Sequence, residues 1–398
     1  MRRLRIGIDA HILGKRKGGV EICLLAIVST LARLDSRNEY FIYVTGKCPL
    51  KAVDLPSNFH LRYLPIENPW FERLLSLPYF YWADRLDLIH VQRAIPPWGC
   101  ARAVLHLHDA AHILMPSIFP PWKRWLLTRL FRWSGRRAAR VITPSACAGA
   151  DLARYYAIDP AKIDVIPNGL DLRASHGQGG PISAGTVQER FDIREPYAIF
   201  VGAIERNKNI RLLIDAFYIF QKEFPVFKLV IAGKASAETR AGYARELRTR
   251  AAELRIAGKI VFTGYLAGAD LTALLSGARM LVLPSTTEGF GFTPLEAMAC
   301  GVPAITADTP VSHEVYGDAV LRAVPDDARD LSRQMTALVR DPELAAACIE
   351  RGRGRTQEYR WENSCARLIE VYGRAAGGES PEKVEDPTPV AARRIGNR

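Results

Sequence analysis

Residues 284–303 read PSTTEGFGFTPLEAMACGVP, and this stretch carries most of the information about the fold. It follows the apolar run 280–283, which predicts a buried strand, and its glycine-bearing loop leads directly into a predicted helix. Thr293 is the predicted N-cap of that helix, and Glu296, three residues later, completes a capping-box pattern. Because a helix start offers free backbone N–H groups and the positive end of the helix dipole, the stretch predicts an anion site suited to phosphate.

Two glutamates in this stretch limit the phosphate interpretation. A carboxylate beside a phosphate is repelled unless it binds something else, such as sugar or ribose hydroxyls. Glu296 has two interpretations, as a helix cap or as a ligand contact, and the spacing alone does not separate them. Glu288 lies in the loop beside a glycine and has no comparable structural role, so it is the better candidate for a ligand contact.

On both sides of this stretch, short apolar runs alternate with longer segments of helical periodicity. The strand-like runs are 4–8, 40–44, 88–91, 103–107, 141–143 and 164–166, followed by 198–201, 228–232, 260–263, 280–283 and 303–306. The helical candidates between them include 20–34, 121–138, 147–156, 210–224, 238–256 and 331–339. This alternation predicts parallel sheets with crossover helices, which is an α/β fold.

A single break in composition predicts two domains. Residues 173–181 read RASHGQGGP, and the series of strands restarts after them. We therefore expect an N-terminal domain over 1–172, a linker over 173–190 and a C-terminal domain over 191–358, with a disordered tail over 377–398. Two doubly wound halves of this kind place their ligands off the carboxyl ends of the strands, which predicts a cleft between them.

The composition excludes several classes of protein. With 398 residues, 48% of them hydrophobic, the chain is too apolar to be disordered throughout. Its seven cysteines are scattered and form no CxxC pair, which is typical of a reducing compartment. The longest apolar run, 22–32, is far below the roughly 20 residues that span a bilayer, so we expect a cytoplasmic protein.

The excess of positive charge, a formal +12, is concentrated in residues 121–140, PWKRWLLTRLFRWSGRRAAR. On a helical wheel one half-turn carries Trp122, Leu126, Leu127, Leu130, Phe131 and Trp133, and the adjacent arc carries Arg129, Arg132 and Arg136. Such a helix suits an anionic bilayer surface, but it is equally a domain helix with a solvated basic face. No zinc-finger, basic-zipper or RNA-recognition signature accompanies the charge, so nucleic acid is not an expected partner.

The spacing Glu288-x7-Glu296, set in EGFGFTPLEAMACGVP, closely resembles the E-x7-E motif of retaining glycosyltransferases of family 4, also called glycosyl transferases group 1. These enzymes use nucleotide sugars and have the GT-B fold of two Rossmann-like domains facing across a cleft. Further stretches resemble family elements in the same order along the chain. They are Gly18-Gly19-Val20, Pro144-Ser145, 165–169 (VIPNG), 201–203 with 207–209, and 359–362 at the start of a helix, about 359–376, that crosses back to the N-terminal domain.

The resemblance implies a role for each matching residue in binding the donor. Glu296 would bind the nucleotide ribose, and Glu288 would lie near the donor sugar. Backbone amides would hold sugar hydroxyls and phosphate at Phe290, Gly291, Phe292 and Thr293. The backbone of Gly264 and Tyr265 would contact the base, while Gly18 and Gly19 would allow a close approach to the diphosphate.

The resemblance also implies the catalytic groups. Lys208 matches the lysine that neutralises the diphosphate, and His108 matches a histidine close to the donor sugar and the acceptor. Many members carry a further arginine at positions that are Ala203 and Asn207 here, so Arg206 is the candidate to replace it. The alternative for Arg206 and Lys208 is an ordinary solvated helix start.

The implied reaction is transfer of a hexosyl unit, such as mannosyl or glucosyl, to a glycan or lipid-linked acceptor in cell-surface polysaccharide biosynthesis. The family is usually assigned a front-face mechanism with retention, and the absence of an Asp-x-Asp motif fits a reaction without metal or other cofactor. The expected location is cytoplasmic, with peripheral binding at the inner face of the membrane left open by 121–140.

Two other enzyme classes remain as alternatives. His106, His108 and His112 occur in the sequence HLHDAAH, and histidines at i and i+2 on a strand can bind a metal, so a metal-dependent hydrolase is one alternative. A sugar-nucleotide epimerase or a phosphorylase of related fold is the other. No second cluster of His, Cys or carboxylates has the spacing of metal ligands.

Overall fold

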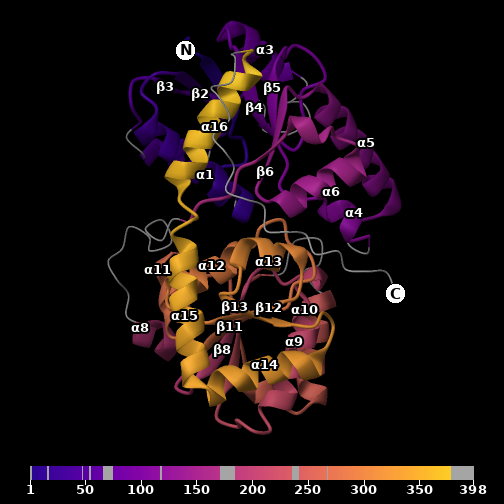
Figure 1. Cartoon of the computed structure of the whole chain (residues 1–398), viewed down its shortest axis with the longest axis vertical. Coiled ribbons are helices and arrows are strands. Elements are labelled where there is room, and N and C mark those ends of the chain that lie inside the picture. Colours follow the sequence, from indigo (N-terminus) through magenta and orange to yellow (C-terminus); the bar gives the residue numbers. More distant parts are fainter. Residues whose placement is uncertain are drawn as a thin grey trace.

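The computed structural model describes residues 2–15, 18–46, 48–52, 55–65, 75–116, 119–170, 184–234, 242–266 and 268–377, which form two parallel β-sheets flanked by helices (Figure 1). The first sheet has the order β3-β2-β1-β4-β5-β6-β7 and the second β10-β9-β8-β11-β12-β13. The strands of the first are β1 (Arg5–Asp9), β2 (Glu39–Val44), β3 (Phe59–Tyr63), β4 (Leu88–Gln92), β5 (Ala103–His106), β6 (Arg140–Thr143) and β7 (Ile163–Val165). Those of the second are β8 (Tyr197–Val201), β9 (Lys228–Ala232), β10 (Ile260–Gly264), β11 (Met280–Leu283), β12 (Ala304–Ala307) and β13 (Val320–Ala323). The predicted α/β class is confirmed, and the strand order reverses between β1 and β4 and between β8 and β11, where such sheets bind ligands.

Helices cover both faces of each sheet. On the first sheet, α1 (Gly19–Leu34) and α16 (Trp361–Ala375) pack on one face, and α3 (Leu77–Ala83), α5 (Pro121–Arg137) and α6 (Ala146–Tyr156) on the other. On the second sheet, one face carries α9 (Ile210–Phe220), α10 (Gly242–Glu253) and α14 (Ala328–Arg340), and the other carries α8 (Ala184–Arg190), α11 (Ala269–Ser276), α12 (Phe292–Ala299) and α13 (Pro310–Tyr316). Because both faces are covered, the central strands read as continuous apolar runs, which is why the sequence revealed them.

Helix α16 returns the chain to the first domain. The long helix α15 (Pro342–Thr356) packs beside α12, and α16 then lies against α1, so that the two yellow helices of Figure 1 connect both sheets. The crossing is held by the N–H of Leu170, which donates to the carbonyl of Tyr359 at 2.8 Å, and by the hydroxyl of Ser364, which donates to the carbonyl of Pro167 at 2.6 Å. Trp361 and Tyr372 are buried in the core shared with α1.

Several boundaries differ from those predicted. The linker expected over 173–190 ends earlier, because 184–190 form α8, whose Val187 is buried in the core and whose Arg190 pairs with Asp270 of α11. Strand β3 was not predicted, since FHLRY at the sheet edge is only half apolar and its burial falls along its length. Residues 171–183 of the linker and 378–398 of the expected tail lie outside the described residues.

Helix α5 presents part of its predicted apolar half to solvent. Its packed side consists of Leu127, Leu130, Phe131 and Trp133. Trp122 and Leu126, predicted on that side, are exposed instead, together with Trp125, because the cluster that packs on the sheet begins only at Leu127. Among the described residues, no helix combines the length and apolar character that a membrane span needs.

A substitution of Gly169 tests the packing at the point where the chain crosses between the domains. A Cβ at this position would lie 2.3 Å from the backbone nitrogen of Trp361, so Gly169→Ala must displace the backbone at the start of α16. We expect a loss of about 2 kcal/mol or more in the free energy of unfolding, measured by denaturant titration. Gly354→Ala, in α15, is the matched control, because a Cβ there meets nothing within 4 Å and should leave stability equal or higher. Equal stability of the two variants would contradict the packing described.

Candidate active site

The loop before α12 is held between the two domains at the carboxyl ends of their strands. The carbonyl of Gly289 accepts a hydrogen bond of 2.7 Å from the hydroxyl of Ser145, which is also the N-cap of α6. A Cβ on Gly289 would lie 2.2 Å from the carbonyl oxygen of His108, so only glycine permits this approach of the two backbones. On the other side, Phe292 lies against Gly19 at the start of α1, where a Cβ would be 3.7 Å from the ring.

Helix α12 begins without a side-chain cap. Its N-cap is Gly291 in a left-handed conformation (φ 80°), not Thr293, which lies inside the first turn. The predicted capping box is therefore wrong, because the glycine turns the chain into the helix two residues earlier than the pattern indicated. The N–H groups at the helix start remain available to an anion, as the loop-to-helix pattern predicted.

Tyr316 of α13 holds this turn in place. Its hydroxyl is within hydrogen-bonding distance of the carbonyls of Gly291 and Phe290, at 3.0 and 3.3 Å. A Cβ on Gly291 would lie 2.0 Å from the same hydroxyl oxygen. The glycine is thus required by both its backbone conformation and its neighbour.

Glu296 has no capping role, and its carboxylate is partly buried within α12. Among the residues that the structure describes, no hydrogen bond or ion pair reaches this carboxylate. Burial raises the pKa of the carboxyl because the charged form loses hydration. A partly buried carboxylate of this kind is stabilised when hydroxyl groups of a ligand donate hydrogen bonds to it. The ligand interpretation of Glu296 is therefore favoured over the cap.

Lys208 and Glu288 face each other across the loop. The ammonium of Lys208, which ends the short 3-10 turn Arg206–Lys208 after β8, donates to a carboxylate oxygen of Glu288 at 2.5 Å. Both side chains are largely shielded, with 17% and 18% of their surface exposed. The N–H of Thr286 donates to the carbonyl of Asn207 at 3.4 Å and joins the same two segments. The ammonium of Lys208, predicted to neutralise the diphosphate, therefore lies beside the loop and is paired with the carboxylate of Glu288.

Arg206 does not join this pair. Its guanidinium pairs with Glu246 of α10 at 2.7 Å and lies over the ring of Tyr243, 4.9 Å from its centroid. The side chain of Arg206 is thus directed to α10, and its replacement of the missing family arginine stays a prediction. Gly264 and Tyr265 end the edge strand β10, where Gly264 takes a positive φ of 76° and Tyr265 is exposed, on the same carboxyl edge as the loop but laterally displaced from it.

His108 supplies the N-terminal side of the site. Its Nε2 lies 3.1 Å from the amide oxygen of Gln92, an acceptor, so Nε2 carries the proton and donates. Burial together with the positive charge of Arg93 lowers the pKa of His108 to about 3, so the ring is neutral near pH 7 and its Nδ1 lone pair is available. Gly18, the N-cap of α1, has a φ of 67° and open space around it.

Three contributors were missed or given no role by the sequence analysis. Ser145 and Tyr316 orient the loop, and Asp109 lies beside it, with its Cβ 3.1 Å from where a Cβ of Gly289 would be. Burial raises the pKa of the Asp109 carboxyl, to which Glu288 adds a second negative charge. The PS element pointed to Ser145, but no motif marks Tyr316, since it lies in another helix and meets the loop only in the folded chain.

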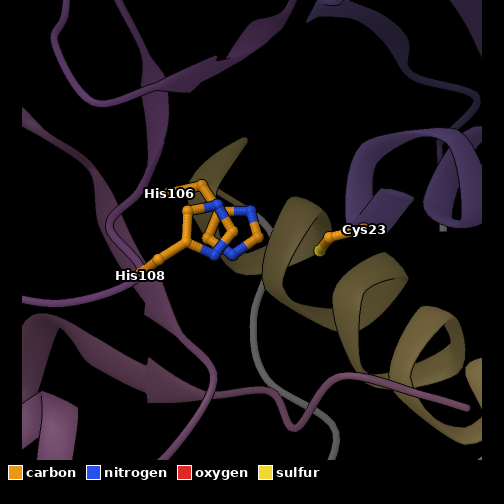
Figure 2. A group of neighbouring side chains, drawn as sticks. All are labelled: Cys23, His106 and His108. Carbon is orange, nitrogen blue, oxygen red and sulfur yellow. The ribbon is translucent and has the colours of Figure 1, made fainter. Parts of the chain in front are cut away.

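The metal site proposed from the histidines is not assembled as predicted. His112 stacks on Tyr156, with its Nδ1 3.1 Å from the phenol oxygen, and is not part of the one group of metal-type ligands gathered within 4.8 Å in the described chain. That group is Cys23, His106 and His108 (Figure 2). The two imidazole rings lie with their centroids 4.0 Å apart and their planes 30° apart, and the thiol of Cys23 donates to Asn168 and has its pKa raised by burial. The ligand set His106, His108 and His112 is therefore wrong.

Comparison with known proteins identifies the family. The model of glycosyl transferases group 1 matches residues 186–355, and that of glycosyltransferase family 4 matches residues 17–174. O-antigen chain mannosyltransferase B of Escherichia coli is 27% identical over 69% of this chain and 71% of its own length. Alpha-maltose-1-phosphate synthase of Mycobacterium tuberculosis is 30% identical over 67% of this chain and 73% of its own length.

Solved structures agree on the fold. Sucrose-phosphate synthase from Thermosynechococcus elongatus superposes with a TM-score of 0.73 at 20% identity, covering 93% of this chain and 98% of its own. Anabaena HepE in complex with UDP and glucose superposes with a TM-score of 0.72 at 19% identity, covering 93% and 100%. The resemblance drawn from the motifs is thereby confirmed. The chain belongs to the glycosyl transferases group 1 family and is a GT-B glycosyltransferase.

Proposed function

We propose that this glycosyltransferase moves a hexosyl unit, such as mannosyl or glucosyl, from a nucleotide sugar to a glycan or lipid-linked acceptor of cell-surface polysaccharide, with retention of configuration. The observation that carries the proposal is the Lys208–Glu288 pair beside the uncapped start of α12. Relatives named as O-antigen chain mannosyltransferases in Escherichia coli and Salmonella typhimurium support the sugar and the context. The UDP and glucose bound to HepE support a nucleotide-sugar donor.

The donor's diphosphate would bind at the N–H groups that begin α12. Lys208 would then turn from Glu288 to the phosphates, where its charge stabilises the negative charge that develops as the nucleotide departs. Glu296, about one turn further along the same helix, would accept hydrogen bonds from the ribose hydroxyls. Glu288, released from the lysine, would be free to accept hydroxyls of the donor sugar.

The transfer itself would follow the front-face course. The bond from the anomeric carbon to the leaving phosphate oxygen breaks, and the acceptor oxygen bonds to the same face of that carbon. The acceptor's proton passes to the leaving phosphate oxygen, so no protein nucleophile is needed. Neutral His108 would orient sugar and acceptor hydroxyls through its Nδ1, since its Nε2 is held by Gln92.

We further propose that the protein is cytoplasmic and binds peripherally to the inner face of the membrane through α5. Trp122 and Trp125, 67% and 58% exposed, lie at one end of its outer face, with Arg129, Arg132 and Arg136 exposed along the rest. Indole rings partition into the headgroup region and arginines bind anionic headgroups, so the two kinds of side chain would act together.

A panel of UDP-, GDP- and ADP-sugars tests donor binding by thermal shift. We expect one nucleotide class to raise the melting temperature, because a ligand of the native state stabilises it by mass action. Glu296→Gln should weaken that donor by about tenfold, because hydrogen bonds to a charged acceptor are lost. Glu343→Gln, an exposed glutamate in α15, is the control and should bind normally. No shift with any nucleotide sugar would reject the proposed donor class.

Substitutions of Lys208 and Arg206 distinguish the roles of the two basic residues in the 3-10 turn. Lys208→Gln should lower kcat/KM by about 10²–10³, because it removes the positive charge that would stabilise the negatively charged leaving group. Arg206→Gln should change kcat/KM by less than about threefold, since its guanidinium is bound by Glu246. Steady-state kinetics at matched melting temperatures gives both values, and a severe loss in Arg206→Gln would restore it as a phosphate ligand.

Metal independence has a direct test. With Lys208 and the start of α12 supplying positive charge, we expect an unchanged initial rate after exhaustive treatment with EDTA. If the rate is lost and added Mg²⁺ or Mn²⁺ restores it, a divalent cation stabilises the charge on the leaving group. Treatment of a metal-dependent transferase in parallel shows that chelation was complete.

Charge reversal tests the membrane face of α5. Arg129→Glu/Arg132→Glu/Arg136→Glu should abolish cosedimentation with vesicles containing phosphatidylglycerol, because about 1 kcal/mol of attraction per arginine becomes repulsion. The exposed arginines Arg329 and Arg333 of α14 give the control, Arg329→Glu/Arg333→Glu, in the other domain. Equal binding by both variants would exclude α5 as the membrane contact.

A further inference from the structure

An apolar groove lies on the N-terminal domain, away from the site described above. It has a volume of about 590 Å³ and is lined by Leu75, Pro78, Tyr79, Trp82, Ala83, Trp98 and Gly99. Three aromatic rings of this lining are more than half exposed, with values of 67% for Tyr79, 69% for Trp82 and 54% for Trp98. Soluble proteins rarely expose several large apolar side chains side by side unless something binds them.

The groove is a built part of the fold. Gly99 has a φ of 74°, and a Cβ there would lie 2.8 Å from Cβ of Pro78, so the loop packs closely on α3. Leu77 and Tyr81, on the inner side of α3, are buried in the same core cluster as Phe131 of α5. The loop is also tied to α5 by the N–H of Ile95, which donates to the hydroxyl of Ser134 at 3.2 Å.

The groove continues the outer face of α5. Both α3 and α5 pack on the same face of the first sheet, and Cys100, next to the groove, lies within the electrostatic influence of Arg137 at the end of α5. The exposed tryptophans of α5, its exposed arginines and the groove therefore follow one another along one side of the domain.

The charges around the groove are positive. Arg85, which follows α3, and Arg137, at the end of α5, are exposed on the segments that border it, whereas the guanidinium of Arg102 donates to the carbonyl of Ala376 after α16. The neighbouring carboxylates already have partners, since Asp84 accepts from the phenol of Tyr43 at 2.9 Å, and Asp87 accepts from the N–H of Arg5 at 2.9 Å and from the guanidinium of Arg2 at 2.6 Å. An apolar groove with an arginine rim is complementary to a lipid that has hydrocarbon chains and an anionic headgroup.

We propose that this groove takes an acyl chain of an anionic phospholipid and, with the outer face of α5, forms one membrane-binding surface. This inference deepens the proposed function, because it rests on the peripheral membrane binding proposed for α5. The groove lies at the amino ends of β4 and β5, whereas His108 follows the carboxyl end of β5, roughly a strand length of 13 Å or more away. The occupant is accordingly a lipid of the bilayer and not the reacting end of the acceptor.

Vesicle binding of full-length variants tests the groove. Trp82→Ser/Trp98→Ser should weaken partition into vesicles of phosphatidylcholine and phosphatidylglycerol by about tenfold, because the groove loses two apolar rings that would contact the acyl chain. Trp82→Phe/Trp98→Phe should stay within about threefold of the wild type, since phenylalanine keeps the apolar surface. Val226→Ser, which replaces a 57% exposed apolar residue of the other domain, is the matched control and should bind normally.

A second readout locates the lipid. Phospholipids brominated on the acyl chain should quench the tryptophan fluorescence of the wild type more than that of Trp82→Phe/Trp98→Phe, because the quenched rings are removed. Unchanged partition of the serine variant, or equal quenching in the two proteins, overturns the proposal. A dimer of the wild type in sedimentation equilibrium that the serine variant abolishes also overturns it, in favour of a second copy of this chain.

The test is independent of the transferase activity. All variants should keep the thermal shift given by the donor, since none of the replaced residues touches the loop before α12. A wild type that binds vesicles through the groove but gives no shift with any nucleotide sugar retains the lipid site and rejects the proposed donor. If the wild type binds a donor but the groove variants partition into vesicles as the wild type does, the proposed donor is retained and the lipid site is rejected.

Discussion

The arrangement of the site depends on the contact between the backbones of Gly289 and His108. This contact brings the loop before α12, in one domain, against the end of β5 in the other, and it leaves no room for a side chain. Ser145 fixes the loop from α6, and Glu314 of α13 accepts hydrogen bonds from the N–H groups of Ala146 and Cys147 at the start of α6. The two domains are therefore joined through the same segments that form the candidate site.

The same constraint explains the charge distribution. Once the loop is held between the domains, Lys208 and Glu288 are shielded and pair at 2.5 Å, while the start of α12 stays uncapped and Glu296 has no partner among the described residues. Partly buried groups of this kind interact more strongly than exposed ones, because less water screens them. Lys208, the start of α12 and the carboxylate of Glu296 thus lie around one loop, as a nucleotide diphosphate and ribose would require.

The sequence predicted the parts whose cause is local. Buried strands are continuous apolar runs, and the spacing from Glu288 to Glu296 is contained in one loop and one helix, so both could be recognised. The capping box failed because Gly291 takes a left-handed conformation, which depends on Tyr316 from another helix. The orientation of the Arg206 side chain could likewise not be predicted, because its partner Glu246 lies 40 residues away. Local patterns thus gave the elements and the motif, while contacts between distant segments decided which side chains reach the site.

The most direct test of this account is hydrogen–deuterium exchange of the intact chain with and without a nucleoside diphosphate, UDP or GDP. We expect slower amide exchange in peptides that cover 286–296 and 206–210, because the diphosphate would occupy the N–H groups of α12 and engage Lys208. Peptides from α14, far along the chain on the opposite face of the sheet, serve as the internal reference and should not change. Unaltered exchange over 286–296 in the presence of a nucleotide that binds would contradict the assignment of this loop as the donor site.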